Sequence, residues 1–184
     1  MNKILCVIDI QQEYNTPDRP FYIQGIEDSL KNALKVLNHA RLNNWEIIHI
    51  KHLQLGNIFT HNSPYSNFIN GFDPIEGEII CIKDNFSSFS SSEFFKALEN
   101  KTSSEIYIIG YGSTMCCLST IIDGYHRGYH FTFVSDASNA KPTAQLTSSV
   151  LHHSATEILQ TFAKIASTKE ILNLDTQKPL PNQH

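Results

Sequence analysis

Short apolar runs rich in Ile, Val, Phe and Tyr alternate along this chain with longer segments of helical periodicity. The runs are too short for free-standing helices, and their composition is typical of buried strands. They occupy residues 4–10, 45–50, 78–82, 105–110 and 129–136. Because strands that alternate with helices form a parallel sheet with helices on both faces, we predict an α/β fold with three layers.

The segments between the runs divide into helices and loops. Helical spacing of apolar residues covers residues 25–43, 91–99, 115–127 and 143–162, and a last short strand is expected near Ile165. Residues 52–77 contain Gly, Asn, Ser and Pro with little periodicity, which favours a surface loop or lid. We therefore predict one domain over residues 1–174, followed by a loose C-terminal tail at 175–184.

The composition limits the classes of partner. A chain of 184 residues that is 41% hydrophobic can bury one substantial core without disulfides. Its 14 basic residues are spread thinly and the net charge is -4, so we expect no nucleic acid partner. No uncharged apolar run is long enough to span a bilayer, so we expect no membrane partner either. The expected partner is a small-molecule substrate.

The four cysteines indicate a compartment rather than a disulfide framework. Cys6, Cys81, Cys116 and Cys117 lack the paired C-x-x-C spacing of zinc or redox sites, so free thiols are expected. The N-terminal MNKILCVID reaches a carboxylate too early for a signal-peptide apolar region. We predict a cytoplasmic location, where thiols stay reduced.

Three reactive side chains fall where predicted strands end. Asp9 closes the first run, Lys83 follows the third, and Cys116 lies a few residues past the fourth. Ligands of parallel α/β sheets bind beyond the carboxyl ends of the strands, so these residues are candidates for one site. A carboxylate beside a buried strand needs a partner or a task, although capping of the following turn is an alternative for Asp9.

Cys116 stands in the segment GYGSTMCCLST. Gly110 and Gly112 permit a tight turn from strand to helix that leaves backbone N–H groups facing the cleft. The positive end of the helix is expected to lower the pKa of a thiol there, which favours a nucleophile. The alternative is that Cys116 is a small buried apolar residue. Cys117 lies about 100° further round the helix, so Cys116 and Cys117 cannot both face the cleft.

Four segments in order resemble the isochorismatase-like cysteine hydrolase superfamily, which includes N-carbamoylsarcosine amidases and nicotinamidases. They are DIQQEY from Asp9, KDNFSSF from Lys83, GYGSTMCCLST, and the continuation through SDA to HHSATEIL. The resemblance covers residues 3–172 and implies a six-stranded, mainly parallel sheet in the order 3-2-1-4-5-6. In that order the third strand is two ladders, about 10 Å, from the first, so we expect the loop at Lys83 to bring it inward.

The resemblance also implies roles for individual residues. Cys116 would be the nucleophile, Asp9 the general base and later acid, and Lys83 the cation that orients Asp9 and favours the thiolate. The backbone N–H groups of Gly112 and Cys116 would form the oxyanion hole, and the peptide joining Tyr111 to Gly112 would be cis. It further implies a homo-oligomer, a dimer or tetramer, with no cofactor. The expected reaction is cleavage of a C–N bond in an amide, ureido or carbamoyl compound through a thioester.

The substrate itself is not specified by the sequence. Candidate residues for the cleft wall are Gln11, Tyr14, Phe89 and Tyr111. For Tyr14, Phe59 and Phe89 ordinary packing is an equal alternative. Asp136 is expected to be a structural carboxylate at a strand end, and Lys51 and His52 are as compatible with a solvated face as with a substrate contact.

At two places the sequence differs from members of the superfamily, and each difference makes one known activity less expected. Nicotinamidases carry D-x-H and a further His for a metal, whereas this chain has HIKHLQLGN, so we expect no metal and interpret His49, His52 and His61 as solvated loop residues. True isochorismatases replace the cysteine, so Cys116 argues against vinyl-ether cleavage. The alternatives are a metal-dependent nicotinamidase-like amidase and a catalytically silent binding or scaffold protein. A flavodoxin-like nucleotide binder is disfavoured because IDIQQEY lacks a phosphate-binding loop.

Overall fold

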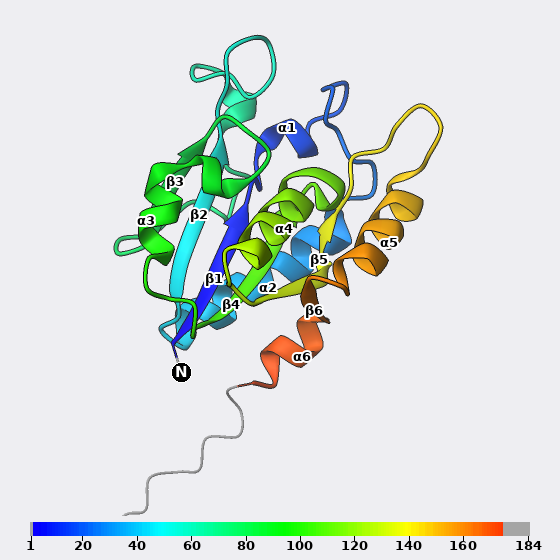
Figure 1. Ribbon diagram of the computed structural model, residues 1–184. Coiled ribbons are helices and arrows are strands. Elements are labelled where there is room, and N and C mark those ends of the chain that lie inside the picture. The colour runs from blue at the N-terminus through cyan, green and yellow to red at the C-terminus, as the bar shows by residue number, and fades with distance from the viewer. Residues whose placement is uncertain (1, 175–184) are drawn as a thin grey trace, which may run out of the picture.

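The computed structural model describes residues 2–174, so the predicted tail at 175–184 lies outside the described residues. Its centre is a six-stranded parallel sheet in the order β3-β2-β1-β4-β5-β6, which confirms the predicted fold and strand order (Figure 1). The strands are β1 (Lys3–Ile8), β2 (Glu46–His52), β3 (Ile79–Lys83), β4 (Glu105–Tyr111), β5 (Phe131–Asn139) and β6 (Ala163–Ala166).

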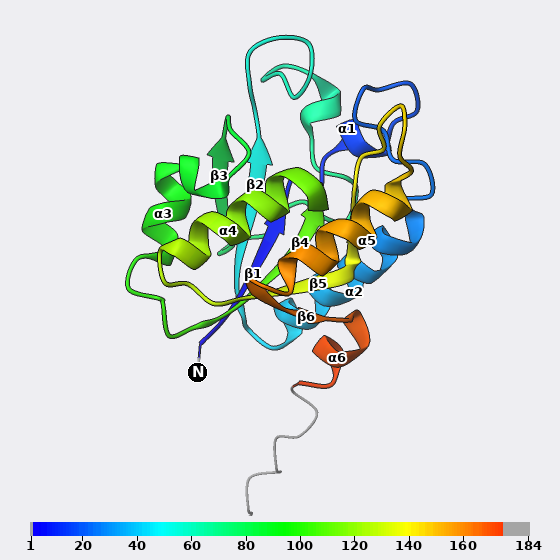
Figure 2. The ribbon, with the colours of Figure 1, turned by 45° about the vertical axis from the view of Figure 1, so that its right-hand side comes forward.

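Helices cover both faces of the sheet (Figures 1 and 2). The α-helices are α1 (Gln12–Asn15), α2 (Glu27–Leu42), α3 (Ser92–Leu98), α4 (Leu118–His126), α5 (Ser148–Leu159) and α6 (Thr168–Leu172). Shorter turns are η1 (Pro64–Ser66), η2 (Ser88–Ser90) and the π-helical η3 (Ser113–Cys117). One face packs against α2 and α6, and the other packs against α3, α4 and α5.

The central strand β1 has apolar side chains on both faces because both faces are covered. Leu5 and Val7 belong to the core on the α2 side, whereas Cys6 and Ile8 belong to the core on the α3 and α4 side. All four are fully buried, as expected for the middle of a parallel sheet. The charge of Asp9 therefore follows directly on a strand that has no access to water.

Among the boundaries that differ from the sequence expectation are the start of the last long helix and the end of β5. The last long helix begins at Ser148 rather than near residue 143, because the Thr147 side chain accepts from the Val150 N–H and caps it there. Strand β5 continues past Asp136 to Asn139. The Asp136 carboxylate accepts from the N–H and hydroxyl of Thr168 at the start of α6, so it has the structural task expected of it.

The carboxyl ends of the strands point to the edge where α1 and the long loops gather (Figures 1 and 2). The loop predicted at 52–77 begins after His52, which is the last residue of β2, and it contains the short turn η1. An antiparallel bridge between Gln11 and Phe68 joins this loop to the segment after β1. None of the helices within residues 2–174 combines the length and apolarity of a membrane span. The covered carboxyl edge is where the three reactive side chains meet.

Candidate active site

Asp9, Lys83 and Cys116 converge at this edge, as the sequence predicts. Asp9 follows β1 directly, Lys83 is the last residue of β3, and Cys116 lies in the π-helical turn after β4. The Lys83 Nζ lies 2.9 Å from Asp9 Oδ2 and 3.3 Å from Cys116 Sγ. The side chains of Asp9 and Lys83 are fully buried, and Cys116 is 4% exposed.

Lys83 reaches Asp9 by a different route from the expected one. The loop does not carry it inward, because Lys83 remains in the ladder with His52 as its register partner on β2. Lys83 is level with His52, the last residue of β2, and its side chain alone spans the distance to Asp9, the residue after β1. The length of the lysine side chain replaces the backbone movement.

The turn that carries Cys116 depends on close backbone packing. Gly110 has a φ of 127°, and a Cβ at this position would collide with the Ile8 carbonyl, so β4 meets β1 closely just before Asp9. The peptide joining Tyr111 to Gly112 is cis, as predicted. His152 Nδ1 lies 2.9 Å from the Ser113 Oγ, a contact not anticipated from the sequence that ties this turn to α5.

The π-helical turn alters which N–H groups are used. The Gly112 carbonyl accepts from the N–H groups of Met115 and Cys117, at 3.0 and 3.2 Å. In an α-helix that carbonyl would accept from the fourth residue on, which is Cys116. The turn therefore bypasses the Cys116 N–H.

The protonation state of the thiol is opposite to the sequence expectation. Burial, followed by the charge of Asp9, raises the pKa of Cys116, and the ammonium of Lys83 offsets this only in part. Burial alone would lower the pKa of Lys83, but its electrostatic interactions and hydrogen bonds with Asp9 and Cys116 raise it. The expectation from the helix end was wrong because desolvation and the neighbouring Asp9 outweigh it. These two directions favour an ammonium on Lys83 and a protonated thiol on Cys116.

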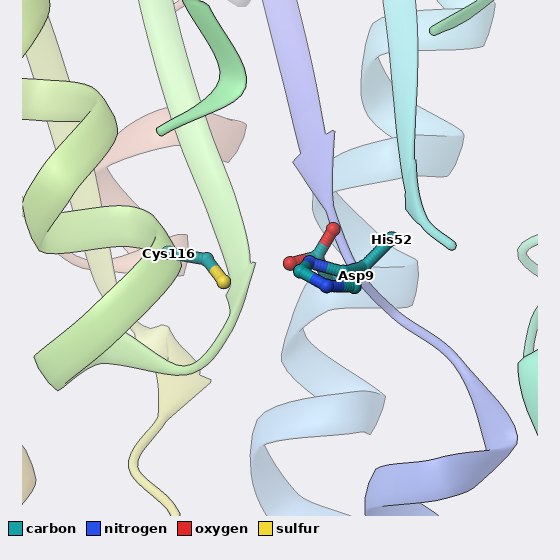
Figure 3. A group of neighbouring side chains, drawn as sticks. All are labelled: Asp9, His52 and Cys116. Carbon is teal, nitrogen blue, oxygen red and sulfur yellow. The ribbon is translucent and has the colours of Figure 1, made fainter. Parts of the chain in front are cut away.

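His52 belongs to the same cluster, and its interpretation as a solvated residue was wrong. It is 6% exposed, and its Nδ1 lies 2.9 Å from Lys83 Nζ. Figure 3 shows Asp9 and His52 close together, with the Cys116 sulfur pointing toward them from the other side. His49 is also buried, whereas His61 is exposed as expected. The burial of His52 could have been predicted from the alternation of side chains along β2, because His52 lies on the same face as Ile48 and Ile50.

Comparison with known proteins identifies the family of this fold and cluster. Residues 3–170 match the model of the Isochorismatase domain. The chain belongs to the isochorismatase family. Among solved structures of this family, an isochorismatase from Pseudomonas putida matches with a TM-score of 0.84 and 26% identity, over 92% of this chain and 89% of that one. A cysteine hydrolase from Pseudomonas syringae pv. phaseolicola matches with a TM-score of 0.86 and 21% identity, over 94% of this chain and 91% of that one.

Curated relatives within the isochorismatase family have different names. A secreted isochorismatase effector of Verticillium dahliae is 27% identical over 92% of this chain and 90% of its own length. A ureidoacrylate amidohydrolase of Methylobacterium radiotolerans is 24% identical over 60% of this chain. The match spans only 43% of that longer enzyme.

The residues expected to line the cleft are mostly engaged within the fold. The Gln11 amide donates to the carbonyls of His52 and Ser66 and accepts from the His52 N–H, so it holds backbone together. The Tyr111 hydroxyl lies 2.9 Å from the Ser29 hydroxyl on α2. Phe89 stacks on Tyr129 in the core, so it has the ordinary packing role that was the alternative to lining the cleft.

Tyr14 has a different position from these three. Its ring lies 5.5 Å from that of Tyr111 and 5.5 Å from that of Phe59, in an aromatic group under the loop after β2. Burial, followed by electrostatic interaction with Cys116 and Asp9, raises the pKa of Tyr14. Tyr14 is thus a neutral, buried phenol close enough to Cys116 and Asp9 to interact with them.

A metal would meet competition at this site. Ligand atoms of Asp9, His52 and Cys116 lie within 4.8 Å of one another and are all buried. The Lys83 ammonium already contacts each of these atoms, so the positive charge of the cluster comes from the chain itself. The absence of a metal in the working protein stays a prediction.

Proposed function

We propose that this protein is a cysteine hydrolase that cleaves the C–N bond of a small amide, ureido or carbamoyl compound. Asp9, Lys83 and Cys116 would be its catalytic residues. The observation that carries the proposal is the buried contact of one ammonium with both a carboxylate and a thiol, at 2.9 and 3.3 Å. The named activity of the ureidoacrylate amidohydrolase relative supports the same bond class.

The first step is proton transfer from Cys116 to Asp9 as sulfur attacks the substrate carbonyl carbon. The three side chains are buried, so creating a net charge among them would be costly. Transfer from Sγ to the Asp9 carboxylate leaves the net charge of the three residues unchanged. Lys83 contacts both atoms and can stabilise the negative charge in either position. A raised thiol pKa is therefore compatible with a nucleophile that is activated only during attack.

Attack places negative charge on the substrate oxygen, and backbone N–H groups would stabilise it. The Cys116 N–H is bypassed by the Gly112 carbonyl in the π-helical turn, which supports its assignment to the oxyanion hole. The Gly112 N–H belongs to the peptide that joins Tyr111 to Gly112 at the start of the same turn, and it would be the second donor.

The remaining steps return each group to its starting state. Protonated Asp9 gives its proton to the leaving nitrogen, so ammonia or an amine departs and the acyl or carbamoyl group stays on sulfur. Asp9 then removes a proton from water, which attacks the thioester or thiocarbamate carbon. The sulfur leaves and recovers a proton from Asp9, and a carboxylic or carbamic acid is released.

Two further expectations accompany this proposal. Assembly into a homo-oligomer stays a prediction, because the structure contains one chain. We also retain the cytoplasm as the proposed compartment, because Cys6, Cys81, Cys116 and Cys117 are all free thiols. The word secreted belongs to the Verticillium relative.

A substrate panel tests the proposed activity. Primary amides, ureido acids including ureidoacrylate, carbamoyl amino acids, nicotinamide and isochorismate should be compared, with ammonia and product release as the readout. We expect turnover of a C–N substrate that Cys116→Ala abolishes and that chelators do not change. Turnover that survives Cys116→Ala would remove the thiol from the mechanism. Loss on chelation would favour the metal-dependent amidase, and no turnover of any compound would favour the silent binding protein.

A further inference from the structure

His52 makes four polar contacts, with three residues, that fix its place. Its Nδ1 lies 2.9 Å from Lys83 Nζ, and its Nε2 lies 3.0 Å from Gln54 Oε1. Its backbone N–H and carbonyl are both bound by the Gln11 side chain, at 2.8 and 3.0 Å. The Phe59 ring packs against the imidazole at 5.1 Å between centroids. An imidazole held on every side is built to contact its neighbour in one orientation.

The contact with Lys83 determines the tautomer of His52. An ammonium donates and never accepts, so Nδ1 must carry the lone pair and Nε2 must carry the hydrogen. The Nε2–H then donates to the Gln54 amide oxygen. His52 is therefore neutral in this arrangement, with its acceptor aimed at the ammonium.

The ammonium has more partners than hydrogens. Lys83 Nζ faces His52 Nδ1 and the Asn85 carbonyl at 2.9 Å each, in addition to Asp9 and Cys116. Three N–H groups serve four acceptors. If His52 Nδ1 and the Asn85 carbonyl each take one hydrogen, the third is left for Asp9 Oδ2 and Cys116 Sγ together. Those two atoms are the pair that exchanges the proton in the proposed reaction.

We propose that His52 is the positioning residue for Lys83. By accepting one hydrogen of the ammonium it directs another to the space between Asp9 and Cys116, where the negative charge moves during catalysis. His52 contacts no reacting atom in this role and acts only through Lys83. The inference rests on the proposed function, because it concerns the activation of the same thiol.

The charges around His52 agree with a neutral ring. Burial and the charge of Lys83 lower its pKa, while Asp9 and Asp84 act in the opposite direction and Gln54 contributes a hydrogen bond that also raises it. These groups come from β3, from the residue after β1 and from the loops that follow β2 and β3. The Lys83 charge accounts for the part of the shift that a substitution can remove.

A histidine NMR titration tests the contact without a substrate. We expect the Nε2–H tautomer of His52 at neutral pH and a titration midpoint below 6.5. Lys83→Met should raise this midpoint, because the neighbouring positive charge is lost. A midpoint that Lys83→Met leaves unchanged, or an Nδ1–H tautomer, would overturn the inference.

Alkylation by iodoacetamide, itself a small amide, tests the effect on the thiol. The rate at Cys116, read by peptide mass spectrometry at pH 7, should fall about tenfold in His52→Leu, and His52→Asn should restore most of it because an amide oxygen can replace Nδ1. A packing role predicts the reverse order, since leucine fills the buried site better than asparagine. His49→Asn, on the opposite face of the same strand, is the matched control and should keep the wild-type rate.

The outcomes separate the two levels of the account. If Cys116 of the wild type is alkylated no faster than N-acetylcysteine at pH 7, both the proposed function and the inference are wrong. If Cys116 is alkylated rapidly in the wild type but at equal rates in His52→Leu and His52→Asn, only the inference is wrong. If His52→Leu does not fold by circular dichroism, the NMR titration of wild type and Lys83→Met still decides.

Discussion

Two buried histidines lie three residues apart on β2 and contact two different charged clusters. His49 faces the α2 side and contacts Glu78, which is paired with Arg41. His52 faces the α3 and α4 side and contacts Lys83, which is paired with Asp9. Each cluster combines a histidine, a carboxylate and a cation, so the two differ in their hydrogen bonding and not in their composition.

The Glu78 carboxylate is satisfied by hydrogen bonds, and the Asp9 carboxylate is not. Glu78 accepts from Arg41, from the Ile75 N–H and from His49. Although burial alone would raise it, these bonds hold the pKa of Glu78 at about 2. Apart from Lys83 and Cys116, no group in the described part of the chain serves the Asp9 oxygens. A carboxylate with spare acceptor capacity beside a protonated thiol is equipped to move a proton, whereas Glu78 is equipped to hold a loop.

The largest expected difference between the clusters is in turnover. Asp9→Asn should lower kcat about a thousandfold, because the leaving nitrogen then has no proton donor. Glu78→Gln is a matched change of carboxylate to amide and should leave kcat within about threefold. Both values would come from the substrate identified in the panel, with folding checked by circular dichroism. Equal losses in the two variants would remove the functional distinction.

A smaller difference is expected in stability when the cation is removed. Lys83→Met leaves the fully buried Asp9 without its counter-ion, so we expect a loss of about 3 kcal/mol of unfolding free energy. Arg41→Met should cost only about 1 kcal/mol, because Arg41 is 19% exposed and Glu78 keeps its other two donors. Urea unfolding of the two variants at pH 7 measures both. The opposite order would mean that Asp9 has access to water.

The smallest expected effect is the loss of the Glu78 contribution to stability at low pH. The folded pKa of Glu78 is depressed from 4.5 to about 2, so its contribution to stability is complete above about 4.5 and is lost as the pH falls toward 2. Wild type should therefore exceed Glu78→Gln in thermal unfolding temperature at pH 7 and converge with it near pH 2. A constant gap over this range would show that Glu78 is not the titrating group.

The sequence predicted the fold and the convergence of Asp9, Lys83 and Cys116, because strand alternation and the position of a residue at a strand end are local patterns. The strand order and the choice of Cys116 over Cys117 came from the family resemblance, since periodicity shows only that the two thiols cannot face the same way. Cys117 lies at 0% exposure in the core, as that choice implies.

The protonation of the site and the place of His52 were not predicted, because both depend on groups distant in sequence. The raised pKa of Cys116 depends on burial by the whole fold and on Asp9, which is far away along the chain. His52 was assigned to a loop, although its parity with Ile48 and Ile50 already placed it on the inner face of β2. Gln11 was assigned to substrate, and only the contacts show that it binds the His52 backbone.

The pH dependence of Cys116 alkylation tests most directly whether Asp9 takes the thiol proton. If the proton passes from sulfur to Asp9 inside the site, no proton leaves the protein, and the wild-type rate should change less than about threefold between pH 6.5 and 8. Without that base, in Asp9→Asn, the rate should rise about tenfold per pH unit below the thiol pKa, as it does for a free thiol. A wild-type rate that rises with pH as steeply as the Asp9→Asn rate would contradict the account.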